Sequence, residues 1–163
     1  IVFGSSYIKK KILKLLIKKK AINIHMGISP FFRGTDCNFW ALNDGYGHLV
    51  GATIHYLSPK LDEGKIIYHA VSEKTKNIHD YSMSTVKSAI NSLIKKFQNK
   101  ELLNIRPFKQ NPKKLIRYSV KKDFTDSSIK KFKNKNYFKF YKLKSNHNLI
   151  LPHELKRREF FND

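Results

Sequence analysis

An asparagine, a histidine and an acidic loop are the parts of this chain whose residue types best suit chemistry. Asn23 and His25 alternate in the segment AINIH, so in a strand both side chains project to one side. Asp62 and Glu63 lie in the loop SPKLDEG, which follows the segment VGATIHYL. An amide and a protonated imidazole can donate hydrogen bonds to a developing oxyanion, and a carboxylate can keep the imidazole charged and move protons. This set of groups suits acyl transfer.

Other interpretations of these residues stay open on the pattern alone. A histidine near a strand end is more often a structural hydrogen-bonding group than a catalyst. Cys37 could serve as a nucleophile, but it lies beside Phe39 and Trp40, which favours a buried structural thiol. No metal site is predicted, because the candidate histidines lack a metal-ligand spacing such as i, i+4 on one helix. These histidines are His25, His48, His55 and His69.

The apolar pattern predicts strands that alternate with helices around these residues. Expected strands cover 1–4, 21–25, 50–57 and 65–72, and expected helices cover 7–19, 37–45 and 79–99. Such alternation is typical of βαβ units, so we expect an α/β fold with a mostly parallel sheet and flanking helices. Ser5 or Ser6 is the expected N-cap of the first helix. Ligands of open α/β sheets bind beyond the carboxyl ends of the strands, where Asn23 and His25 fall.

Length and composition indicate one folded domain. The chain has 163 residues, of which 40% are hydrophobic, and this is enough to bury a core. It contains no apolar run long enough to span a membrane. The single cysteine excludes an internal disulfide, which suits a cytoplasmic protein. The first residues, IVFGSSYIKKK, do not resemble a signal peptide and instead suggest a chain that begins at a buried strand in the middle of a domain.

The net charge of +21 raises the question of a nucleic-acid partner. However, the basic residues are mostly lysines spread along the whole chain. Proteins that recognise phosphates and bases favour arginine, whose guanidinium forms bidentate hydrogen bonds. Abundant Ile and Asn also point to a bias toward AT-rich codons. We therefore favour a solvated lysine-rich surface over an anionic partner, with nucleic acid kept as an alternative.

Two separated motifs carry a more specific signal. In AINIHMGISPFFRG, an Asn-x-His pair precedes a proline, two residues and Arg-Gly; the positions are Asn23, His25, Pro30, Arg33 and Gly34. In VGATIHYLSPKLDEG, a G-x-T-x-H strand precedes Leu-Asp-x-Gly; the positions are Gly51, Thr53, His55, Leu61, Asp62 and Gly64. Together these motifs strongly resemble the folate-dependent formyltransferase family, which includes methionyl-tRNA formyltransferase, glycinamide ribonucleotide transformylase and the sugar N-formyltransferases. The resemblance covers residues 1–100 and implies the C-terminal part of that family's Rossmann-like sheet.

The resemblance implies a role for each motif residue. Asn23 would stabilise the tetrahedral intermediate that forms when an acceptor amine attacks the formyl carbon of 10-formyltetrahydrofolate. His25 would be the cationic partner of the same oxygen, and Asp62 would keep His25 protonated and help to remove the proton of the amine. No enzyme nucleophile and no metal are needed in such a reaction. Pro30 would occupy the loop proline of the family, which suits a cis peptide bond.

The resemblance also implies where the folate binds. It would lie against the segment FGSSY and the loop 57–64, mostly through backbone groups. The residues expected to contact it are Ser6, Tyr7, Leu57 and Asp62. Ser6 and Tyr7 match the family's pattern only loosely.

Several features depart from the family's pattern. The family's nucleotide-binding-like first half, with its glycine-rich loop for the acceptor phosphate, has no counterpart, so we expect a truncated protein or the C-terminal part of a longer one. Residues after Arg-Gly differ from the tRNA-type enzymes, and residues 101–163 are short for their C-terminal β-barrel. We expect residues 1–100 to form the catalytic domain and 101–163 a basic, partly helical extension, with a helix from Thr125 or Asp126 and an edge strand at 137–143.

These departures favour a small-molecule amine acceptor, such as an amino sugar, over initiator tRNA. A non-catalytic basic fragment that binds nucleic acid and a decayed gene fragment with an intact motif are the competing hypotheses. The sequence predicts no oligomeric state.

Overall fold

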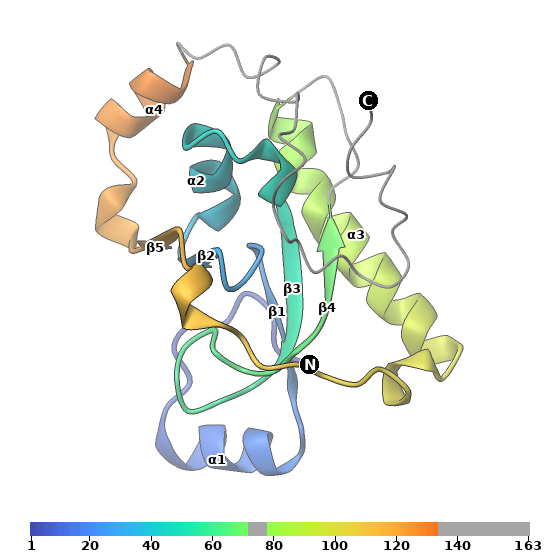
Figure 1. Cartoon of the computed structure of the whole chain (residues 1–163). Helices are drawn as coiled ribbons and strands as arrows, with labels where there is room; N and C mark the ends of the chain where they lie inside the picture. Colours follow the sequence, from blue (N-terminus) through green and yellow to red (C-terminus); the bar gives the residue numbers. More distant parts are fainter. Residues whose placement is uncertain (72–77, 134–163) are drawn as a thin grey trace.

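The computed structural model describes residues 1–71 and 78–133, and it has an α/β architecture (Figure 1). The described helices are α1 (Lys10–Lys18), α2 (Cys37–Asn43), α3 (Ile78–Gln98) and α4 (Asp126–Lys133). The strands are β1 (Ile22–His25), β2 (Phe32–Gly34), β3 (Gly51–Tyr56), β4 (Ile66–Val71) and β5 (Arg117–Ser119). The strand expected at 137–143 lies outside the described residues. None of the described helices has the length and apolar character needed to cross a membrane.

The main sheet has the strand order β1-β3-β4. The α/β class is confirmed, but the expectation of a mostly parallel sheet is wrong for these strands, because both pairings are antiparallel. For β3 and β4 the reason lies in their connection, which is a loop without a helix, whereas a parallel pair needs a longer crossover. Parallel pairing occurs beside β1, where Val2 forms an isolated bridge to Asn23.

The N-terminal segment differs from its expected structure in two ways. The expected strand at 1–4 is reduced to the bridge at Val2, and α1 begins later than predicted, at Lys10. Its N-cap is Lys9, which makes no side-chain capping bond, so the expected serine cap is wrong. The serines instead belong to a segment without helix or strand that forms a wall of the cavity described below.

Helix α3 packs against β3 and β4 and covers one face of the sheet (Figure 1). Its buried residues recur at intervals of about one turn: Tyr81, Thr85, Ala89, Leu93 and Lys96. Several large apolar residues of the helix are exposed, and Phe97 is 72% exposed. Small side chains such as Ala89 allow the helix backbone to approach the sheet closely, which turns the larger residues Ile90 and Ile94 outward.

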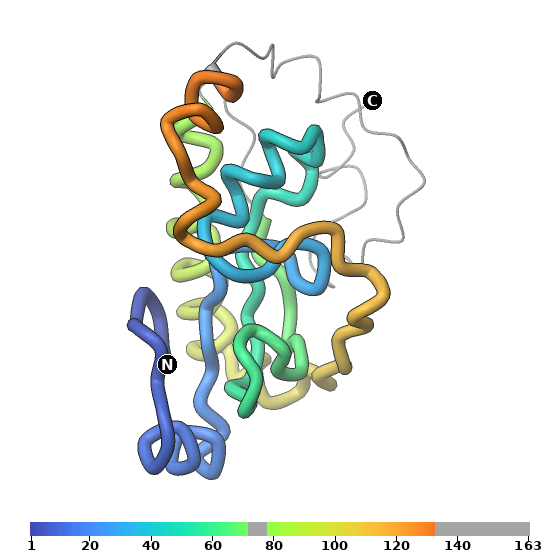
Figure 2. The backbone as a smooth tube through the Cα atoms, turned by 90° about the vertical axis from the view of Figure 1, so that its left-hand side faces the viewer, coloured from blue at the N-terminus to red at the C-terminus, as the bar shows by residue number. Residues whose placement is uncertain are grey.

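Residues after α3 run back across the molecule (Figure 2). Phe108 exchanges two backbone hydrogen bonds with Ile66, each 2.9 Å long. Further on, β5 pairs in parallel with β2, which belongs to the Asn-x-His motif region. At the start of α4, the hydroxyl of Thr125 accepts a hydrogen bond from the backbone N–H of Ser128, as expected for an N-cap. The segment 104–119 therefore packs against the loops that follow β1 and β3.

Candidate active site

A cavity of about 410 Å³ lies between the N-terminal segment, the end of β1 and the loop after β3. This volume is within the range of small-molecule sites. Nine of the motif and folate-contact residues singled out from the sequence line it: Ser6, Tyr7, Asn23, His25, Gly34, His55, Leu57, Leu61 and Asp62. Two other motif residues, Pro30 and Arg33, lie outside the cavity wall, and the Ser29–Pro30 peptide bond is cis, as expected.

His25 is a buried residue at the end of β1. Its Nδ1 lies 3.5 Å from Oδ2 of Asp62, and its Nε2 lies 3.3 Å from the carbonyl oxygen of Phe32. Both ring nitrogens therefore face acceptors, an arrangement in which the imidazolium can donate on both sides. The 3.5 Å separation between Nδ1 of His25 and Oδ2 of Asp62 is longer than a usual charge-assisted hydrogen bond, so the two groups form a loose pair.

Asn23 is oriented by His55, which lies opposite it in the antiparallel pairing of β1 and β3. Nδ1 of His55 lies 2.8 Å from the carbonyl oxygen of Tyr56, so this nitrogen is a donor. Nε2 of the neutral ring then accepts a hydrogen bond from Nδ2 of Asn23 over 3.1 Å. Burial lowers the pKa of His55, which favours this neutral form. The sequence identified His55 as a motif residue, but its contact with Asn23 depends on strand register.

The loop that carries Asp62 has a constrained backbone. Asp62 has φ of 52°, in the left-handed region that non-glycine residues rarely adopt. Gly64 must be glycine, because a Cβ atom there would lie 1.6 Å from the carbonyl oxygen of Tyr56. Arg33 donates to the carbonyl oxygen of Leu61 at 3.0 Å and to Oε1 of Glu63 at 2.7 Å. The hydrogen bond and charge of this guanidinium lower the pKa of Glu63.

The loop after His25 is held from β3. The hydroxyl of Thr53 donates to the carbonyl oxygen of Gly27 at 2.6 Å and accepts from the backbone N–H of Ser29 at 2.8 Å. Cys37 follows this loop, with its Sγ 3.6 Å from Nε2 of His25. Burial, aided by the charge of Asp62, raises the pKa of the Cys37 thiol to about 12. Such a thiol is a poor nucleophile at neutral pH.

The histidines considered for a metal site do not form one in the described part of the chain. There, no group of three or more His, Cys, Asp or Glu side chains is arranged to hold a metal ion. Nε2 of His69 instead lies 2.8 Å from the carbonyl oxygen of Ser29.

Comparisons with known proteins agree with this geometry. The sequence model of the formyl transferase family matches residues 5–102, so the chain belongs to the formyl transferase family, as its two motifs indicated. No curated protein sequence gives a significant match.

Solved structures of two formyltransferases and of HypX share this fold. The formyltransferase PseJ from Anoxybacillus kamchatkensis is 26% identical; the alignment covers 80% of this chain and 73% of that one, with a TM-score of 0.58. It was solved with UDP-4,6-dideoxy-4-formamido-L-AltNAc and tetrahydrofolate. A 4-N formyltransferase from Francisella tularensis is 21% identical over 80% of this chain and 57% of that one, with a TM-score of 0.60. HypX from Aquifex aeolicus is 20% identical over 75% of this chain but 21% of that one, with a TM-score of 0.53.

Proposed function

We propose that this protein transfers a formyl group from 10-formyltetrahydrofolate to an amine of a small-molecule acceptor, such as an amino sugar. The observation that carries the proposal is the meeting of Asn23, His25 and Asp62 on one cavity. An amide donor and an imidazole can stabilise the oxyanion that forms when an amine attacks a formyl group, and a carboxylate can accept the proton of the amine.

The reaction begins when the amine nitrogen attacks the formyl carbon and the formyl oxygen takes up negative charge. Asn23 donates its second amide N–H to this oxygen, because the first is held by Nε2 of His55 at 3.1 Å. His25 donates from Nδ1 to the same oxygen. Asp62, whose Oδ2 lies 3.5 Å from that Nδ1, balances the imidazolium charge and accepts the proton that the amine loses. The tetrahedral intermediate collapses when the bond from its carbon to N10 of the folate breaks. N10 then takes up the proton that Asp62 accepted from the amine, which restores the carboxylate.

The folate is expected to bind between the N-terminal segment and the loop after β3. Ser6, Tyr7 and Leu57 line this part of the cavity, and Asp62 lies where the loop meets His25. The donor's formyl group would then reach the oxyanion donors. The amine itself is the nucleophile, so the proposed chemistry requires neither the Cys37 thiol nor a metal ion.

The choice of acceptor rests on the PseJ enzyme, which is 26% identical and was solved with a formamido nucleotide sugar and tetrahydrofolate. This likeness favours an amino group on a nucleotide-linked sugar. Initiator methionyl-tRNA is the alternative acceptor, and its use in the same assay is an outcome of the test.

The test is an assay of formyl transfer by mass spectrometry. The protein is incubated with 10-formyltetrahydrofolate and, in separate reactions, with UDP- or dTDP-linked amino sugars or with methionyl-tRNA, and the product is measured as the formylated acceptor. Asn23→Ala and His25→Ala should each reduce the turnover number by about 100-fold or more, as loss of an oxyanion donor does. Lys87→Ala, a change at an exposed residue of α3, is the control. Lack of folate binding by the unaltered protein, or full activity of His25→Ala, would contradict the proposal.

A further inference from the structure

Gln110 contacts the loop that carries Asp62, although it lies outside both motifs and outside the residues matched by the family model. Its Nε2 donates to the carbonyl oxygen of Asp62 at 2.7 Å and to that of Gly64 at 2.9 Å. One amide group therefore bridges the two carbonyls that flank Glu63. Gln110 lies 48 residues after Asp62 in the sequence.

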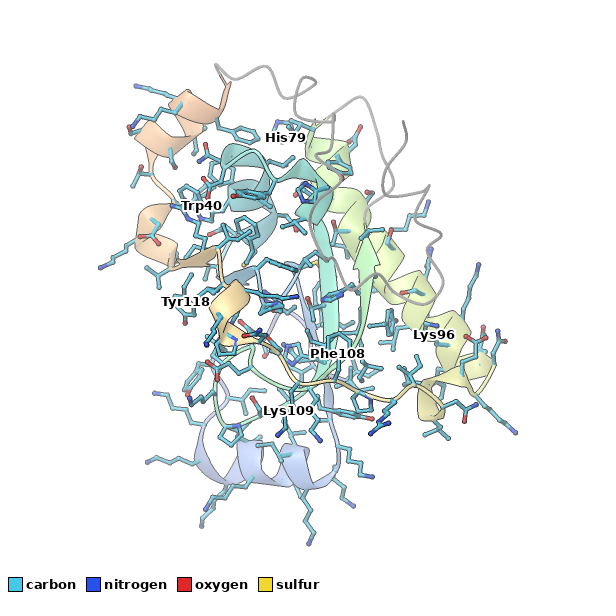
Figure 3. The ribbon with its side chains drawn as sticks, in the orientation of Figure 1. Trp40, His79, Lys96, Phe108, Lys109 and Tyr118 are labelled. Carbon is cyan, nitrogen blue, oxygen red and sulfur yellow. The ribbon has the colours of Figure 1, made fainter. Side chains whose placement is uncertain are left out.

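The backbone beside Gln110 is itself anchored. Phe108 and Ile66 exchange two backbone hydrogen bonds of 2.9 Å, which attach this segment to the first residue of β4. Figure 3 shows Phe108 and Lys109 at the end of the sheet where α1 lies. Because this attachment is two residues from Gln110, the amide has little freedom to leave the loop.

The loop needs such support because its own conformation is unfavourable. The left-handed backbone of Asp62 costs free energy and persists where surrounding contacts hold it. Arg33 holds one part of the loop, through the carbonyl of Leu61 and the carboxylate of Glu63, and Gln110 holds the other. The loop is thus held by a buried arginine and a half-buried glutamine from two distant parts of the chain.

The orientation of the Gln110 amide supports a positioning role. Its Oε1 is buried and finds no hydrogen-bond partner within the described residues, whereas Nε2 makes both bonds to the loop. A flipped amide would direct Oε1 at two carbonyl oxygens and would be repelled. The two hydrogen bonds from Nε2 therefore outweigh the cost of leaving the buried Oε1 without a partner.

We propose that Gln110 is a positioning residue that holds the Asp62 carboxylate within reach of His25 during formyl transfer. This inference rests on the proposed function for its catalytic consequence. Oδ2 of Asp62 already lies 3.5 Å from Nδ1 of His25, so a small movement of the loop would break the contact between the carboxylate and the imidazole. Since displacement of a catalytic group by about 1 Å can cost up to about 100-fold in rate, weaker holding of the loop should reduce the turnover number.

Two variants and one control test this inference. Gln110→Met keeps the length of the side chain and removes both donors, whereas Gln110→Glu keeps its shape and directs a carboxylate at the two carbonyls. Lys109→Met changes the exposed neighbour and should behave like the unaltered protein. Each protein is examined by hydrogen exchange with mass spectrometry, by thermal unfolding, by binding of 5-formyltetrahydrofolate and by steady-state kinetics of formyl transfer.

We expect faster amide exchange in peptides that cover residues 57–66 of both Gln110 variants, with exchange elsewhere unchanged. The turnover number should fall by about 10-fold, with the KM for the acceptor amine within about twofold of that of the unaltered protein. Unchanged exchange, an unchanged turnover number, or faster exchange throughout the protein would overturn the inference.

The two proposals fail in different ways. If the unaltered protein neither binds the folate nor transfers formyl groups, the proposed function is contradicted, and so is the catalytic role of Gln110. If the unaltered protein is active and the Gln110 variants keep its turnover number, only the positioning role falls.

Discussion

Nε2 of His55 lies 3.1 Å from Nδ2 of Asn23, and the two residues stand opposite each other across the antiparallel pair β1 and β3. The pairing places the two side chains together, and the protonation of His55 determines which end of the asparagine amide faces it. With Nδ1 of His55 directed at the carbonyl oxygen of Tyr56, Nε2 is the acceptor, and the Asn23 amide must present an N–H to it. Its other N–H is then available to an oxygen in the cavity.

His55→Phe should reduce the turnover number of formyl transfer by about 10-fold, because Asn23 loses the acceptor that orients its amide. His55→Gln should retain more activity, since the carbonyl oxygen of a glutamine can accept the same hydrogen bond. The measurement is the steady-state rate at saturating folate and acceptor. Equal activity of His55→Phe and the unaltered protein would show that the contact has no catalytic importance.

The buried His55 ring should also make folding stability depend on pH. In the folded protein, burial lowers the pKa of His55 below its ordinary value of 6.5, so the unfolded chain binds the proton more readily. The contribution of the neutral ring to the free energy of unfolding is therefore complete above pH 6.5. It is lost as the pH falls from 6.5 toward the lower pKa of His55 in the folded protein. Urea unfolding between pH 5 and pH 8 should show a stability loss toward low pH that is smaller in His55→Gln. Parallel pH curves for the two proteins would contradict this expectation.

Cys37 should resist alkylation in the folded protein. Its pKa of about 12 leaves almost no thiolate at pH 8, and its side chain is buried. Because this is the single cysteine of the sequence, intact-mass measurement after iodoacetamide treatment reports on it alone. We expect modification in urea and little modification in buffer over the same time. Rapid modification in buffer would mean that the thiol is accessible and partly ionised.

Arg117 should stabilise the packing of β5 against α2. Its guanidinium lies 3.6 Å from the ring centroid of Trp40, and its Nη1 donates to Oδ2 of Asp44 at 2.8 Å. Arg117→Ala should lower the free energy of unfolding by about 1–2 kcal/mol, the range of a partly buried cation–π contact with an added ion pair. Urea denaturation measures this, with the exposed Arg106→Ala as control. A loss no larger than that of the control would show that the stacked pair contributes little.

The positions of the main elements could be predicted because they follow from local patterns. The helix 37–45 and the strand 50–57 were expected within two residues of α2 and β3. The alternation of Asn23 and His25, which places both side chains on one side, is also a local property of a strand. The motif spacing then indicated that an acidic loop would join them. The cavity that contains Asn23, His25 and Asp62 agrees with that expectation.

The less successful expectations concern contacts between distant residues. Periodicity shows that α3 is amphipathic, but the burial of Ala89 rather than Ile90 depends on how closely the helix approaches the sheet. The antiparallel direction of β3 and β4 depends on how their connecting loop turns, which the apolar pattern of each strand does not encode.

The sequence by itself determined which residues could carry the chemistry, because their types and spacing within strands and loops are local properties. Only the tertiary structure decided how they are held. Strand register places His55 against Asn23, and the return of the chain after α3 brings Gln110 to the carbonyl oxygen of Asp62. These contacts join residues 32 and 48 positions apart. They depend on the packing of whole elements, which no local pattern specifies.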